Sequence, residues 1–131
     1  MRRYRLFVRN RRRYEVVPVG FSWGALLLGP IWAAAYGLLL RYSVVLVLAT
    51  IPVFVAGLFE GSVRDAVGLI GLAVVIAGHV YFAFNAFAWR QLRLASIGFE
   101  ELASISAKSA RDALTTWSGS DEASAYLGNA P

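Results

Sequence analysis

Two stretches of apolar sequence decide the fold: Tyr42–Phe59, which reads YSVVLVLATIPVFVAGLF, and Ala66–Trp89, which reads AVGLIGLAVVIAGHVYFAFNAFAW. They hold 18 and 24 residues, and neither contains an aspartate, glutamate, lysine or arginine. An α-helix needs about 20 apolar residues to cross the hydrocarbon core of a bilayer. The two stretches therefore predict two membrane-spanning helices, and the short charged segment between them predicts an antiparallel hairpin.

The composition of the whole chain supports this interpretation. Of 131 residues, 58% are hydrophobic and 16% are charged. A soluble domain of this size cannot bury so much apolar side chain, so the surplus needs lipid or a partner protein. The chain has no cysteine and one histidine, which excludes disulfides, thiolate chemistry and a metal site with several histidines. We predict an all-α integral membrane protein without a cofactor.

The segment before the hairpin, residues 20–40, predicts a broken helix. Gly29-Pro30 lies in its middle, and a proline removes an amide donor from the helix. Ser22 is placed to cap the first half. We expect a re-entrant or interfacial element that packs on the two spanning helices. Within it, Ala33 and Gly37 are four residues apart and predict a close contact with another helix.

Small residues recur along the second apolar stretch. Gly71 and Gly78 are seven residues apart, Ala73 and Ala77 are four apart, and Gly68 precedes them. Such repeats let two helices approach closely. We therefore expect a packing seam here, either for the first spanning helix or for a partner protein.

Residues 1–19 read as a basic arm. Seven of the 13 basic residues of the chain lie between Arg2 and Arg13. Basic residues beside a span stay in the cytoplasm, and each one near an anionic leaflet adds about 1 kcal/mol of attraction. We expect lipid contact, with an acidic partner protein as the alternative and no nucleic acid. The residues expected at the lipid headgroups are Arg9, Arg11, Arg12, Arg13, Arg41, Arg90 and Arg93.

The distribution of arginines also predicts the topology. If residues 21–40 crossed the membrane completely, Arg41, Arg90 and Arg93 would lie outside the cell, whereas a re-entrant element keeps them inside with the arm. The positive-inside rule favours the second arrangement. We therefore expect a multi-pass protein with both termini in the cytoplasm, and a start that is retained rather than cleaved as a signal peptide.

The part after the spans, residues 95–131, reads as a polar tail. Ser109 leads into a short amphipathic helix over Ala110–Trp117, and the Gly, Ser, Asp and Pro residues from Ser118 onward predict a frayed end. The predicted organisation is an arm at 1–19, a membrane domain at 20–94 with spans at 42–59 and 66–89, and this tail.

His79 is the ionisable residue of the second apolar stretch. An ionisable group inside a membrane segment is a functional candidate by default. It could bond a backbone carbonyl, relay a proton or bind haem iron, but a bis-histidine haem needs a second histidine. We expect a structural hydrogen bond and no catalytic or metal site. Asn85 lies on the same stretch and predicts a hydrogen bond between helices.

A set of aromatic and glycine residues resembles a known family. The residues that carry the likeness are Phe21, Trp23, Gly29, Pro30 and Trp32 before the hairpin, and Asn85 within its second helix. They resemble small bacterial inner-membrane proteins catalogued as domain of unknown function twenty-six twenty-eight, over residues 20–114. The resemblance implies a compact helical protein of the bacterial inner membrane. It carries over no catalytic residue.

Three functions are compatible with these features. We expect a non-enzymatic accessory or assembly subunit that packs laterally on a larger membrane complex, because the chain offers small-residue seams and no catalytic set. The alternative is a module that binds anionic lipid through its arginine-rich arm. The third is a small transporter or enzyme that uses His79.

Overall fold

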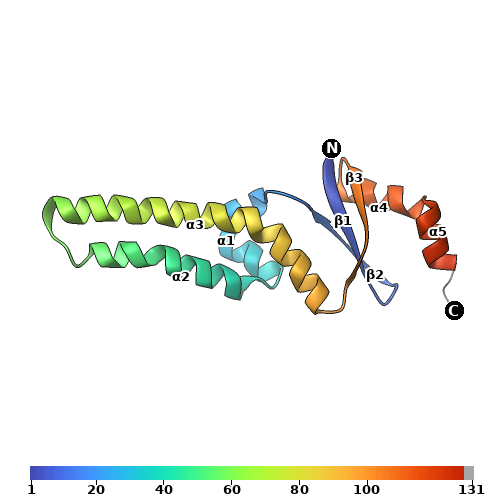
Figure 1. The fold of residues 1–131 in the computed structure, drawn as a ribbon, viewed down its shortest axis with the longest axis horizontal. Coiled ribbons are helices and arrows are strands. Elements are labelled where there is room, and N and C mark those ends of the chain that lie inside the picture. The colour runs from blue at the N-terminus through green and yellow to red at the C-terminus, as the bar shows by residue number, and fades with distance from the viewer. Residues whose placement is uncertain (129–131) are drawn as a thin grey trace. The chain divides into compact units, whose positions relative to one another are not determined.

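The computed structural model describes residues 1–128, which fall into two units (Figure 1). The hairpin unit is Phe21–Trp89. The sheet unit combines Met1–Gly20 with the chain from Arg90 onward. Because the second unit is built on a β-sheet, the fold is mixed α and β, and the predicted all-α class is wrong.

The sheet has three antiparallel strands in the order β2-β1-β3. β1 (Arg2–Arg9) lies in the centre, between β2 (Arg13–Pro18) and β3 (Glu100–Ala107). Leu6 fixes the register, because it lies opposite Val16 on one side and Ala103 on the other. The predicted arm and tail are therefore not separate appendages, since strands from both form one sheet.

The reason for this strand is an alternation within the arginine-rich segment. Tyr4, Leu6 and Val8 are buried, and they alternate with Arg3, Arg5 and Phe7, of which Phe7 is also buried. Successive side chains of a strand point to opposite faces, so a period of two predicts a strand with one buried face. Interpreting the segment by its charge alone concealed that period.

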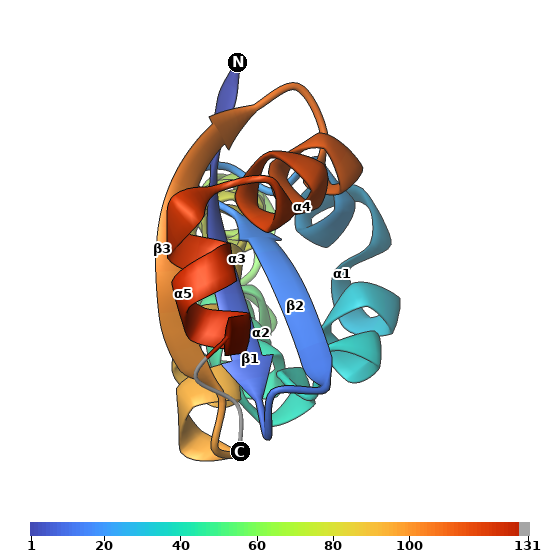
Figure 2. The same cartoon turned by 90° about the vertical axis from the view of Figure 1, so that its right-hand side faces the viewer.

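Two helices cover the Leu6 face of the sheet (Figure 2). α4 (Ala110–Ser118) is capped by Ser109, whose Oγ accepts the Asp112 amide at 3.1 Å. Trp117 is buried against Leu6, and its ring lies 5.6 Å from that of Tyr14. α5 (Asp121–Gly128) follows, so the segment predicted to fray contains a second helix. The last three residues of that segment, 129–131, lie outside the described residues.

The hairpin unit contains α2 (Leu39–Ala56) and α3 (Gly61–Ser96) as far as Trp89, and the two helices run antiparallel (Figure 1). Both are long and apolar enough to cross a membrane. With 18 and 36 residues, they are about 27 and 54 Å long. Only 17% of the most apolar window of each helix is buried. α3 begins at Gly61, so most of the charged segment 60–65 belongs to this helix. The turn between α2 and α3 is formed by residues 57–60.

The predicted break in the segment before the hairpin is confirmed. α1 (Trp23–Ala35) is interrupted at Gly29, whose φ is 37° and ψ is −104°. The Oγ of Ser22 caps its first half by accepting the Ala25 amide at 3.1 Å. At 13 residues, α1 is about 20 Å long and is too short to cross a bilayer core of about 30 Å.

Gly37 ends α1 and is not part of a packing face. It follows the helix with a φ of 67°, and its amide donates to the Ala34 carbonyl while the Leu38 amide donates to that of Ala33. This pair of bonds is a Schellman motif, which glycine favours because it adopts positive φ freely. The predicted helix contact through Ala33 and Gly37 is therefore wrong for Gly37, whereas Ala33 is fully buried.

The core of the hairpin unit lies where α1 packs on α2 and α3. Its buried residues are Ala25, Trp32, Ala33, Leu38, Tyr42, Phe82, Ala83 and Ala86. Next to it, the Ser22 amide donates to the Ala83 carbonyl at 3.1 Å. The chain thus enters the unit beside the part of α3 through which it leaves, so both connections to the sheet unit are at the same end of the hairpin.

Candidate functional site

A seam of glycines joins α2 and α3. A Cβ built on Gly71 would lie 2.9 to 3.1 Å from the side chain and backbone of Val53, and one built on Gly78 would lie 2.9 Å from the Cβ of Ala49. Separations this short leave no room for a side chain on either glycine. The seven-residue repeat therefore brings the two backbones together.

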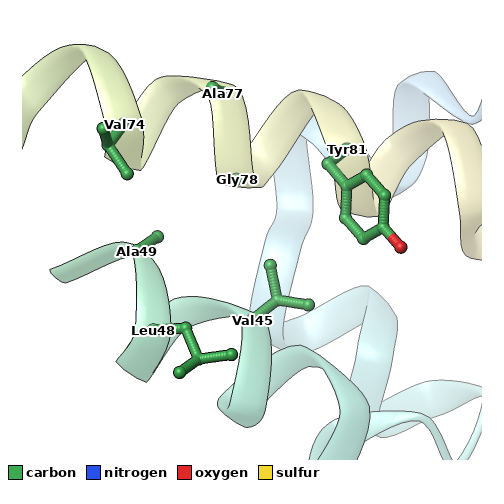
Figure 3. Close-up of a pocket in the computed structure, with 7 residues that line it drawn as sticks. All are labelled: Val45, Leu48, Ala49, Val74, Ala77, Gly78 and Tyr81. Carbon is green, nitrogen blue, oxygen red and sulfur yellow. The ribbon is translucent and has the colours of Figure 1, made fainter. Parts of the chain in front are cut away.

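An apolar groove runs along one side of this seam (Figure 3). It has a volume of about 380 Å³. It is lined by Val45, Leu48 and Ala49 of α2 and by Val74, Ala77, Gly78 and Tyr81 of α3. The small residues Ala49, Ala77 and Gly78 keep it shallow and smooth, which is the shape into which another helix packs closely.

Two residues of the predicted seam, Gly68 and Ala73, lie outside this contact. Gly68 has no atom within 4 Å of the position its Cβ would take, and Ala73 is exposed outside the groove. Of the predicted seam, Gly71 and Gly78 thus face α2, Ala77 faces the groove, and Gly68 and Ala73 face outward.

His79 is held by two hydrogen bonds within the hairpin. Its Nδ1 lies 3.0 Å from the Val75 carbonyl and its Nε2 lies 3.1 Å from the hydroxyl of Tyr42. A carbonyl only accepts, so Nδ1 donates to it, and in the neutral imidazole the Tyr42 hydroxyl then donates to Nε2. Both ring nitrogens are therefore used in linking α3 to itself and to α2, which is a structural arrangement and leaves no nitrogen for a ligand.

Removing the Tyr42 hydroxyl is expected to have a small effect. Hydrogen bonds between helices in a membrane protein average about 0.6 kcal/mol, so Tyr42→Phe should lower the free energy of unfolding by about that amount. The ring still packs on Phe82, 5.0 Å away. Equilibrium unfolding in mild detergent would measure the change, and a loss above about 2 kcal/mol would contradict a purely structural bond.

The predicted headgroup arginines have different surroundings. Arg41 lies over the ring of Trp89 at 5.7 Å, and Arg11 lies over that of Tyr126 at 5.4 Å. Arg90 donates to Glu15 at 2.9 Å. Arg93 is exposed in the last turn of α3. The partners of Arg11 and Arg90 come from distant parts of the sequence, which explains why sequence reasoning missed them.

The remaining three headgroup arginines gather at the turn between β1 and β2. Arg9, Arg12 and Arg13, together with Asn10, line a hollow of about 310 Å³. The sequence shows the cluster of charges, but only the strand pairing shows that they surround one space.

The residues that carry the family resemblance divide into buried and exposed groups. Trp32 is in the core of the hairpin unit, and a Cβ on Gly29 would lie 2.9 Å from the Tyr42 hydroxyl. Trp23 is 61% exposed, but its ring lies 5.0 Å from that of Phe21. Asn85 donates to the Tyr81 carbonyl of its own helix at 2.8 Å, so the predicted bond between helices is wrong.

The residues that can ligate metals are scattered over the described part of the chain, residues 1–128. No group of three or more histidine, cysteine or acidic side chains could hold a metal ion there. The same residues contain no buried side-chain nitrogen or oxygen without a hydrogen bond. The hollows of the described chain include the apolar groove and the arginine-lined hollow. No protein-family model, curated protein or solved structure matches this chain.

Proposed function

We propose that this chain is a non-enzymatic integral membrane protein that acts as an accessory or assembly subunit of a larger membrane complex. The proposal begins with the apolar surface of α2 and α3, of which little is buried within the chain. Water does not tolerate contiguous apolar surface of this length. Lipid does, and both helices have the length that a crossing requires.

The arrangement of the hairpin unit supports the topology that we propose. Because the chain enters and leaves the hairpin at the same end, we place the segments before Phe21 and after Trp89 on one side of the membrane. The sheet unit that they form carries the arginine-rich strands, so the positive-inside rule assigns it to the cytoplasm. The family resemblance suggests the bacterial inner membrane.

The groove between α2 and α3 is the observation that carries the accessory role. Lipid tails are as apolar as leucine, so helices associate in a membrane by close packing and not by the hydrophobic effect. Ala49, Ala77 and Gly78 give a third helix access to both backbones of the hairpin. We assign this groove to a spanning helix of the partner protein.

Filling the groove is expected to release the partner. Ala77 lines it and Ala73, one turn earlier on α3, does not, although both are exposed. Ala77→Phe should therefore separate the chain from its complex, while Ala73→Phe should leave the complex intact. Native mass spectrometry after gentle detergent extraction would compare both variants with the unmodified protein, and circular dichroism would check that each is helical.

Three results would contradict the proposal. One is an unmodified chain that is recovered alone, and another is a particle that contains only copies of this chain. The third is loss of the partner from both alanine variants, because that would show a general effect of bulk on α3 and no specific role for the groove.

A further inference from the structure

The turn between β1 and β2 concentrates positive charge in one place. Arg9 and Arg13 are directly opposite each other in the antiparallel pair, and the Arg12 amide closes the turn by donating to the Arg9 carbonyl at 3.3 Å. Like charges at opposite positions destabilise a strand pair. The pairing of β1 with β2 therefore holds these arginines around the hollow, although their mutual repulsion lowers the stability of the strand pair.

The acidic residues of the sheet unit do not neutralise this cluster. Glu15 pairs with Arg90 at 2.9 Å and Glu101 pairs with Arg5 at 3.4 Å. Within residues 1–128, the ion pairs involve neither Arg9, Arg12 nor Arg13. The hollow thus has positive walls without a carboxylate, which suits an anionic ligand.

Arg11 lies in the same turn but not around the hollow. Asn10 and Arg11 have φ values of 52° and 54°, a conformation that favours glycine in two-residue turns. The Arg11 guanidinium lies over the Tyr126 ring instead. The turn thereby separates one arginine, which packs on α5, from the three that line the hollow.

We propose that Arg9, Arg12 and Arg13 bind the phosphate group of an anionic phospholipid. Guanidinium groups present paired donors that match two phosphate oxygens, so arginines bind phosphate with defined geometry. The side-chain amide of Asn10 adds a donor to the same wall. At about 310 Å³, the hollow has the volume of a small ligand site and accommodates one headgroup.

A lipid is the source of phosphate because the sheet unit is tied to the hairpin by two chain connections, at Gly20 and at Arg90. This part of the inference rests on the proposed membrane insertion of α2 and α3. With the hairpin inserted, the tether keeps the hollow at a high effective concentration of headgroups on its side of the bilayer. A free phosphate has no such advantage.

Nuclear magnetic resonance of the arginine Nε groups would test the site in the full-length protein. In one arm, the protein is placed in phosphatidylcholine nanodiscs with and without phosphatidylglycerol. In the other, it is kept in neutral detergent and titrated with inorganic phosphate. We expect the signals of Arg9, Arg12 and Arg13 to shift in the first arm, with weaker binding in the second, and the Arg3 signal to stay in place.

Two variants with the same change of charge separate a site from general attraction. Arg12→Gln should weaken binding to phosphatidylglycerol nanodiscs more than tenfold, because it removes charge-assisted hydrogen bonds to the phosphate as well as one positive charge. Arg3→Gln, at an exposed position of β1, should weaken it about fivefold at most, which is the general effect of one basic residue near an anionic leaflet. Arg13→Gln serves as a second test should Arg12→Gln disturb the turn.

The outcomes distinguish this inference from the membrane proposal. Equal weakening by Arg12→Gln and Arg3→Gln would overturn the site, even in a protein that is fully inserted. Binding of inorganic phosphate without any response to phosphatidylglycerol would overturn the lipid as ligand. Extraction of the protein by alkaline carbonate would instead overturn membrane insertion, and the detergent arm would still report on the arginines.

Discussion

Trp117→Ala is expected to unfold the sheet unit. Trp117 is 5% exposed and packs on Leu6 and Ala123, and its ring also lies 6.2 Å from that of Tyr126. Replacing a buried tryptophan by alanine costs about 3 to 5 kcal/mol because it leaves a cavity. Small domains have a net stability of only about 5 kcal/mol or little more. The loss is therefore comparable with the whole stability of the unit.

Amide hydrogen exchange would show this effect strand by strand. We expect the amides of β1, β2 and β3 to lose their protection in Trp117→Ala, while those of α2 and α3 keep theirs. Leu127→Ala is the control, because Leu127 is on α5 and is 50% exposed. Exchange that stays slow in all three strands of Trp117→Ala would show that the core described for the sheet unit does not hold it together.

Gly71→Ala is expected to force α2 and α3 apart. The new Cβ would lie 3.0 Å from the backbone nitrogen and 3.1 Å from the Cα of Val53, and backbone atoms cannot move aside as a flexible side chain does. Overpacking of this kind costs about 1 to 3 kcal/mol. Unfolding in a detergent titration, followed by circular dichroism, should show the lower stability.

Gly68→Ala provides a control of opposite sign. It is the same substitution on the same helix, but Gly68 has open space around its Cβ position. Alanine is favoured over glycine in a helix interior by about 1 kcal/mol, so this variant should be as stable as the unmodified protein or more so. If the two variants lose stability equally, close contact at Gly71 does not explain the seam.

The hairpin could be predicted from sequence because its signals are local. The two apolar stretches, the Gly29-Pro30 break and the repeat of Gly71 and Gly78 are each visible within one segment. The partner of His79 could not be predicted, because the rotation of α2 against α3 decides that Tyr42 faces it. Gly37 was misinterpreted since small-residue spacing does not distinguish a packing face from a helix end that needs positive φ.

Local sequence patterns did not predict the sheet, for a different reason. The segment around Arg5 contains a strand alternation, but its charges outweigh that signal in any average of hydropathy. Its contacts with β3 also connect distant positions, since Arg5 and Glu101, whose side chains form an ion pair, are 96 residues apart. A strand with so many charged residues can be predicted only when its partner strands are known. Because the hollow depends on the pairing of β1 with β2, the sequence alone did not show that Arg9, Arg12 and Arg13 surround one space.

The central position of β1 has a consequence for the order of synthesis. The ribosome makes β1 and β2 first, but β3 emerges only after both long helices have been translated. Until then one edge of β1 has unpaired amides and carbonyls, which readily accept a strand from another molecule. A nascent chain that stalls between Ser96 and Ala107 would therefore be prone to aggregate, and completion of the sheet would mark a molecule whose hairpin has already been made.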